Sequence, residues 1–208
     1  ISTGLPVTVL IENEEYFQDA YESLKEFGMK QRGATLIPFP DCWKSVKYHG
    51  QTIERIAKYK MDNLGHDGNT QKVLDELRTL FHGLNIVPEN KRRLVSVSKM
   101  LHFLLPDLVM PIDSKVLRLV GKGEIPSKVE RQFEWFREVF NKYVELTAQL
   151  GLKRSNGDGK WWNISVPKRI DNAIMGFWDL FDDKSIERII CGHIDMLLKY
   201  LEAGNQSA

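Results

Sequence analysis

Residues 127–151, SKVERQFEWFREVFNKYVELTAQLG, indicate the fold class of this chain. Ser127 and Glu130 form the S-x-x-E pattern of a helix capping box, and Gly151 is typical of a helix end. Between them, large apolar side chains recur at steps of three or four, which is the spacing of one helix face. They are Val129, Phe133, Phe136, Phe140, Tyr143 and Val144. The stretch predicts a long amphipathic helix whose aromatic face belongs to the core.

Helical periodicity and helix start and stop signals extend to both sides of this stretch. They predict helices at residues 14–27, 52–64, 70–81, 114–120, 167–181 and 185–201. Another helix starts near Pro88 and either continues toward Leu105 or breaks near Ser96 and Ser98, and Pro106 ends it in both cases. Residues 33–41 contain two prolines and are expected to form a loop, as is the polar segment 153–160. Only residues 7–11 resemble a strand. We therefore predict an all-α fold, a globular multi-helix bundle.

The chain has 208 residues, 42% of them hydrophobic, which is enough to bury a substantial core. We expect a single helical domain, 1–208, with two packed lobes as an alternative arrangement. One lobe would combine residues 1–88 and 151–208, and the other would hold residues 89–150.

Several classes of protein are not expected from this composition. Apolar runs are interrupted well short of the roughly 20 residues that a membrane span requires. The first residues show no basic stretch leading into an apolar signal region, which favours an intracellular protein. Cys42 and Cys191 lack the paired spacing of a zinc or iron-sulfur site, so neither a metal nor a cofactor is expected.

Basic residues are concentrated in the middle of the chain. Residues 91–131 contain nine Lys and Arg against four Asp and Glu. Such an excess can form an electropositive face for the phosphates of a nucleic acid. It can equally be the solvated surface of ordinary helices.

Residues 98–121, SKMLHFLLPDLVMPIDSKVLRLVG, join an apolar helix to a second helix through a proline-bounded loop. Lys99 opens the first helix, and Asp113 stands at the N-cap position of the second. This arrangement resembles part of the helix-hairpin-helix DNA glycosylase superfamily, in which a lysine and an aspartate occupy these places. The resemblance covers about one-eighth of the chain.

The resemblance implies base-excision chemistry of the lyase type. Lys99 would attack the sugar carbon as the base departs, while Asp113 would assist deprotonation and stabilise the developing positive charge. Basic neighbours such as Arg92, Arg93 and Lys115 would lower the pKa of Lys99. The two residues are about one helical turn closer in sequence than in the family.

The family grips DNA phosphates through a glycine-rich hairpin, but residues 90–98 read NKRRLVSVS and contain no glycine. Phosphate contacts are therefore expected from charged side chains. The candidates are Lys91, Arg92, Arg93 and Lys115.

Three aromatic residues are further candidates for a substrate pocket. His102 follows Lys99 by one helical turn and could tune it or bind substrate, although its apolar neighbours also fit a partly buried, satisfied histidine. Trp161 and Trp162 stand among basic residues, a composition that suits stacking on an unpaired or flipped base. Both tryptophans could instead pack in the core.

Two functions are consistent with these features. The first is a nucleic-acid-binding protein that excises bases as a DNA glycosylase and AP lyase. The alternative is a non-enzymatic, all-helical binding module whose interface surrounds Trp161, which the missing glycines favour. The enzyme hypothesis requires Lys99 and Asp113 to converge on one accessible site.

Overall fold

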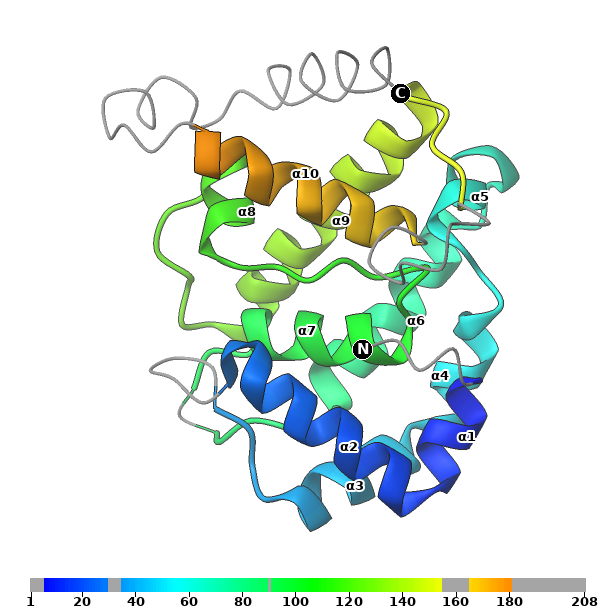
Figure 1. The fold of residues 1–208 in the computed structure, drawn as a ribbon, viewed down its shortest axis with the longest axis vertical. Coiled ribbons are helices and arrows are strands. Elements are labelled where there is room, and N and C mark those ends of the chain that lie inside the picture. Colours follow the sequence, from blue (N-terminus) through cyan, green and yellow to red (C-terminus); the bar gives the residue numbers. More distant parts are fainter. Residues whose placement is uncertain (1–5, 30–34, 90, 155–164, 181–208) are drawn as a thin grey trace.

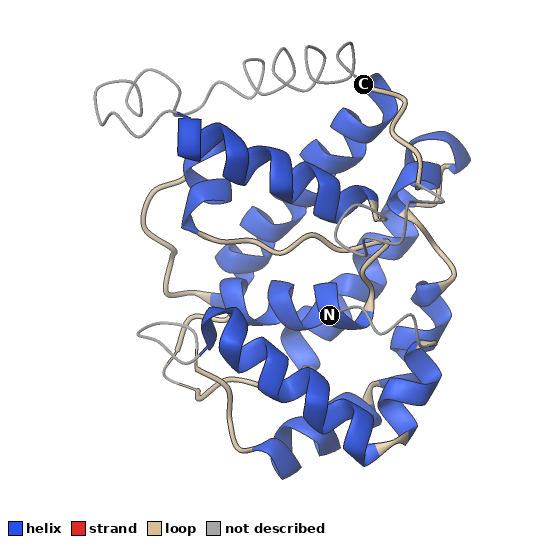
Figure 2. Ribbon diagram, viewed as in Figure 1, coloured by secondary structure: helices blue, strands red, loops and turns tan. Residues whose placement is uncertain are grey.

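The computed structural model of the protein describes residues 6–29, 35–89, 91–154 and 165–180. Helices and connecting loops make up these residues, and no strand occurs among them (Figure 2). The predicted all-α multi-helix bundle is therefore confirmed. No helix in this part of the chain combines the length and apolar character needed to cross a membrane.

The helices follow one another along the chain with short connections. Their bounds are α1 Val7–Glu12, α2 Glu14–Leu24, η1 Lys25–Met29 (a π-helical turn), α3 Phe39–Tyr48, α4 Gly50–Ala57, α5 Met61–Asp67, α6 Thr70–Gly83, α7 Leu94–Leu104, α8 Ser114–Leu119, α9 Val129–Gln149 and α10 Val166–Leu180. Predicted helices 70–81, 114–120 and 167–181 correspond to α6, α8 and α10. The predicted helix 185–201 lies outside the described residues.

Helix α9 occupies the centre of the bundle, where it contacts α5, α6, α7 and α10. In Figure 1, α7 crosses the middle of the molecule, with α2 and α3 on one side of it and α8 and α10 on the other. The buried side chains of all these helices belong to one continuous core. Two helices that are distant in sequence, α7 and α10, thus meet the same central helix.

The aromatic face of α9 packs in this core, as the sequence predicts. The ring of Phe136 stacks between Phe133 and Phe140, with ring centroids 5.9 and 6.3 Å away. Phe81 of α6 adds contacts of 5.5 Å to Phe133 and 5.6 Å to Phe136. Large buried aromatic rings at helical spacing therefore join α6 to α9.

The predicted strand at residues 7–11 is wrong, because this segment forms helix α1. Ile11 packs so closely on Gly50 of α4 that a Cβ atom at Gly50 would lie 3.2 Å from the Ile11 side chain. The Trp43 indole of α3 donates a hydrogen bond of 3.2 Å to the Ile11 carbonyl. Packing against α3 and α4 outweighs the β propensity of this short apolar run.

The predicted loop at residues 33–41 extends too far, because α3 begins within it at Phe39. Pro38 is the N-cap of α3 and Pro40 lies in its first turn, where a missing N–H leaves no bond unmade. The Phe39 ring also contacts Tyr21 and Trp43, with centroid distances of 5.5 and 6.2 Å. These prolines start a helix rather than prevent one.

The predicted helix 52–64 is interrupted and forms α4 and α5. The chain leaves the helix after Ala57 and resumes at Met61, whose N–H donates to the Asp107 carbonyl at 2.9 Å. The predicted helix 14–27 also changes before its end, since η1 follows Leu24 and Gly28 has a φ of 89°. A positive φ of this kind favours glycine and ends the helix.

Helix α7 begins at Leu94, well after Pro88, which was predicted to lie in its first turn. Pro88 instead accepts a turn hydrogen bond of 2.9 Å from the Lys91 N–H. The start of α7 is set by Gln132 of α9, whose side-chain oxygen accepts from the N–H groups of Arg93 and Leu94 at 2.7 and 3.0 Å. A side chain distant in sequence thus acts as the helix cap.

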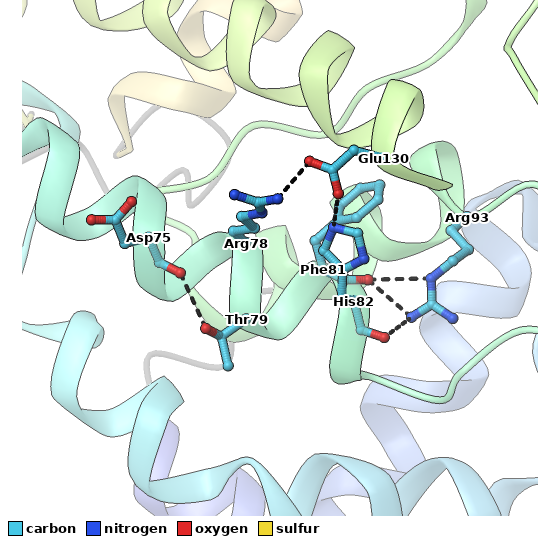
Figure 3. A network of polar contacts seen from close by, with 7 residues as sticks. All are labelled: Asp75, Arg78, Thr79, Phe81, His82, Arg93 and Glu130. Atoms are coloured by element: carbon cyan, nitrogen blue, oxygen red, sulfur yellow. Dashed lines mark hydrogen bonds and ion pairs between the residues drawn. The ribbon is translucent and has the colours of Figure 1, made fainter. Parts of the chain in front are cut away.

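The predicted capping box of α9 does not form. The N-cap is Lys128, whose side chain makes no capping bond. Glu130 instead turns toward α6, where it accepts from Arg78 at 2.8 Å and lies 3.2 Å from His82 Nε2 (Figure 3). An ion pair with Arg78 and a contact with His82, both on the neighbouring α6, replace the local cap.

Candidate functional site

Two polar side chains of α7 hold the following loop against the helix. Ser98 Oγ accepts a hydrogen bond of 3.0 Å from the Ile112 N–H, and His102 Nδ1 lies 2.6 Å from the Val109 carbonyl. Ser98 and His102 are one turn apart, so they fasten the loop along one line of the helix surface. Asp113 directly follows Ile112, which is bonded to the residue before Lys99 in the middle of α7.

Asp113 is the N-cap of α8, as the sequence predicts. Its Oδ1 atom accepts from the N–H groups of Lys115 and Val116 at 2.8 and 3.0 Å. These bonds satisfy backbone donors in the first turn of the helix. The remaining carboxylate charge acts on Lys99, as the electrostatics of that residue show.

Lys99 is half-buried, and its ammonium group meets Phe27 of η1. The Nζ atom donates a hydrogen bond of 2.8 Å to the Phe27 carbonyl and lies 5.0 Å from the centre of the Phe27 ring. A Cβ atom at Gly28 would lie 3.4 Å from Nζ, an ordinary contact distance, so it is the φ of 89° rather than the lysine that favours glycine there. Because the Phe27 side chain is 42% exposed, the amine lies under a ring at the surface of the molecule.

Burial lowers the pKa of Lys99, because an ammonium group loses hydration there. Asp113 and Asp171 oppose this shift through their negative charge, and Lys168 adds to it. The structure therefore brings the two residues singled out from the sequence, Lys99 and Asp113, within electrostatic reach of each other. It also adds charged residues that the sequence did not single out.

Lys168 and Asp171 enter this site from α10. Lys168 Nζ donates to Asp171 Oδ2 at 2.5 Å, and their side chains are only 13% and 7% exposed. Lys168 Nζ also lies 5.4 Å from the centre of the Phe27 ring, the same ring that covers Lys99. The available sequence signal was the K-x-x-D spacing on the apolar face of the predicted helix 167–181.

Tyr143 of α9 is buried, and no hydrogen bond to its hydroxyl is found in the part of the chain that the structure describes. Burial raises the pKa of the Tyr143 phenol well above its ordinary value, and Asp171 and Asp113 raise it further. Its hydroxyl therefore belongs to the same electrostatic group. We call Lys99, Asp113, Tyr143, Lys168 and Asp171 the two-lysine cluster.

The bases predicted to contact phosphates have different surroundings. Arg93 donates to the Phe81 carbonyl at 2.9 Å and to the His82 carbonyl at 3.4 Å (Figure 3). It also donates to the Leu84 carbonyl, and these bonds connect the start of α7 to the end of α6. Burial lowers the pKa of its guanidinium group. The donors of Arg93 are therefore directed at backbone carbonyls.

The other three predicted bases lie nearer the surface. Arg92 is exposed and pairs with Glu124 at 2.6 Å. Lys91 is exposed, and Lys115 is half-buried in the first turn of α8. Lys91 and Arg92 precede the first residue of α7, and Lys115 is the second residue of α8.

His102 is buried, in keeping with the interpretation of a satisfied core histidine. Burial lowers its pKa to about 4, so the imidazole is neutral near pH 7. Its Nδ1 atom must then carry the proton that the Val109 carbonyl accepts. Trp161 and Trp162, the other candidates for a pocket, lie outside the described residues.

The cluster can act as a source of a nucleophilic amine. A desolvated lysine with a lowered pKa supplies more free amine near neutral pH than an exposed lysine, and nearby carboxylates stabilise a cationic intermediate. Among the described residues no group of three or more His, Cys, Asp or Glu side chains is placed to hold a metal ion. No family model matches this sequence, and comparison with curated proteins and with solved structures finds no significant match.

Proposed function

We propose that this protein binds nucleic acid and processes abasic or damaged sites as a DNA glycosylase and AP lyase. The observation that carries the proposal is the half-buried Lys99 amine, with its lowered pKa, in reach of the Asp113 carboxylate. A carbonyl carbon is the electrophile that such an amine attacks. The resemblance of residues 98–121 to the glycosylase superfamily selects a sugar as the substrate.

The roles of the two residues follow from this chemistry. The unprotonated Lys99 amine adds to C1′ of the ring-opened abasic sugar, and loss of water gives an iminium ion. Asp113 stabilises that positive charge and accepts a proton during the addition. The ring and the carbonyl of Phe27 both contact Lys99, so Phe27 must move away from the amine before a sugar can reach it.

Borohydride trapping on duplexes that carry an abasic site or a damaged base tests the proposal. Borohydride reduces the iminium to a stable secondary amine, so wild-type protein should form a covalent adduct with DNA. Lys99→Ala should lose it. Lys142→Ala, which removes an exposed lysine of α9, should trap at the wild-type level.

Absence of any adduct and of base release on the whole panel would contradict the enzymatic proposal. The alternative is a non-enzymatic helical binding module, and the partners of two predicted phosphate ligands favour it. The Arg93 donors bond to backbone carbonyls, and Arg92 pairs with Glu124. Fewer cations are therefore left to bind phosphates. If binding to the same duplexes is also absent at low salt, the binding module becomes the better account.

A further inference from the structure

Two lysines from different helices approach one aromatic ring in the two-lysine cluster. Lys99 of α7 and Lys168 of α10 lie 5.0 and 5.4 Å from the centre of the Phe27 ring. We propose that Lys168 is a positioning residue for Lys99: its ion pair with Asp171 fixes a second positive charge at the Phe27 ring that Lys99 also approaches, and that charge opposes protonation of the Lys99 amine. The inference deepens the proposed function, because it concerns the same nucleophile.

The ion pair is built to hold Lys168 in place. The two side chains are almost buried, and their N–O distance is 2.5 Å. Removing two charges from water costs free energy that their attraction only partly returns, so a buried pair is weak evidence for a stabilising role. A fixed charge next to a reactive group is an effect that an exposed, freely rotating lysine could not supply.

Besides burial, the charges that act on Lys99 come from α10 and the start of α8. Asp113 from the start of α8 and Asp171 from α10 raise its pKa, whereas Lys168 lowers it. Phe27 of η1 contributes a carbonyl and a ring rather than a charge. His102 of α7 is neutral near pH 7, and burial and the two carboxylates keep the Tyr143 hydroxyl of α9 protonated.

Removing the charge of Lys168 and removing the charge of Asp171 should therefore change the pKa of Lys99 in opposite directions. Loss of Lys168 removes the charge that opposes protonation of Lys99, so the amine should titrate at a higher pH. Asp171 also raises the pKa of Lys99, so its charge acts in the same direction as the loss of Lys168. Loss of the Asp171 charge should make Lys99 titrate at a lower pH.

Competitive labelling with a trace of acetic anhydride measures this titration without DNA. The free amine attacks a carbonyl carbon of the anhydride and acetate leaves, and mass spectrometry of the Lys99 peptide gives its reactivity at each pH. We expect the pH of half-maximal reactivity to rise by about one unit in Lys168→Met and to fall by about one unit in Asp171→Asn. Lys168→Arg keeps the charge and should stay close to wild type.

Lys142→Met is the matched control, because it removes an i,i+3 ion pair of 3.0 Å with Glu145 at the surface of α9. It should leave the Lys99 profile unchanged. Circular dichroism and thermal melting establish that each variant is folded. If Asp171→Asn does not fold, the comparison of the Lys99 profiles of Lys168→Arg and Lys168→Met still tests the inference. An unchanged profile in Lys168→Met overturns the inference.

The labelling experiment tests the role of Lys168, and the trapping experiment tests base excision, so each proposal can be refuted without the other. If the profile shifts as expected but no duplex is trapped, Lys168 positions Lys99 and base excision is the wrong chemistry for that amine. If duplexes are trapped through Lys99 while the profile of Lys168→Met stays at the wild-type value, base excision stands and the role of Lys168 is refuted.

Discussion

The Asp113 carboxylate contributes to the molecule in two physically separate ways. Its Oδ1 atom accepts the two backbone hydrogen bonds that cap α8, and its charge raises the pKa of Lys99. A cap requires only an acceptor oxygen, which asparagine also provides. Stabilising a cationic intermediate requires negative charge, which asparagine lacks.

Substitutions at Asp113 should therefore separate stability from chemistry. Asp113→Asn should keep the free energy of unfolding within about 0.5 kcal/mol of wild type, while Asp113→Ala should lose about 1 kcal/mol through the missing cap. Both should reduce borohydride trapping by about tenfold or more, because the charge is gone in each. Urea denaturation and the duplex panel measure the two effects. Wild-type trapping by Asp113→Asn would show that the charge has no part in the reaction.

Among the helices, α7 depends most on partners elsewhere in the chain. Its first N–H groups donate to Gln132 of α9, whose side-chain amide in turn donates to the Ser127 carbonyl at 3.2 Å. Arg93 then connects this end of α7 to the carbonyls that end α6. The position of Lys99 along α7 is thus set by neighbouring helices rather than by a local cap.

Removal of the Gln132 side chain should destabilise the protein. In Gln132→Ala the buried N–H of Leu94 and its neighbour lose their acceptor, and we expect the free energy of unfolding to fall by about 1 to 3 kcal/mol. Gln149→Ala is the control, since that exposed glutamine of the same helix donates its amide hydrogen bond to Glu145, one turn earlier on α9. Its effect should stay within about 0.5 kcal/mol. Equal urea midpoints for the two variants would contradict the capping role.

For the molecule as a whole, a neutral histidine in the core couples stability to pH. The folded-state pKa of His102 is lowered to about 4 from an ordinary value of 6.5. As the pH falls below 6.5, His102 binds a proton in the unfolded chain but not in the folded chain. The free energy of unfolding therefore decreases between pH 6.5 and 4. Below that window His102 causes no further loss.

His102→Asn should flatten this dependence. The asparagine amide can still donate to the Val109 carbonyl but cannot take up a proton. Between pH 6.5 and 4 the wild type should lose roughly 3 kcal/mol more than the variant, a difference measured by urea denaturation at a series of pH values. Parallel curves for the two proteins would mean that His102 is not neutral in the folded state.

Local sequence alone determined the all-α class, the aromatic core face of α9 and the Asp113 cap. Each depends on residues within a few positions of one another: the period of 3.6 residues along α9, an acceptor next to the N–H groups of α8, and glycines with positive φ at Gly121 and Gly151. The electrostatic effect of Asp113 on Lys99 was also predictable, because one loop joins their helices.

Tertiary structure alone decided the helix at residues 7–11, the cap supplied by Gln132 and the use of the Arg93 donors. It also decided the composition of the site, since Lys99 bonds to Phe27 across 72 positions of sequence and shares the Phe27 ring with Lys168 of a third element. A local pattern carries no information about which distant side chain will share a ring or a carbonyl. Burial then lowers the pKa of Lys99, because the hydration that its ammonium group loses depends on the side chains packed around it.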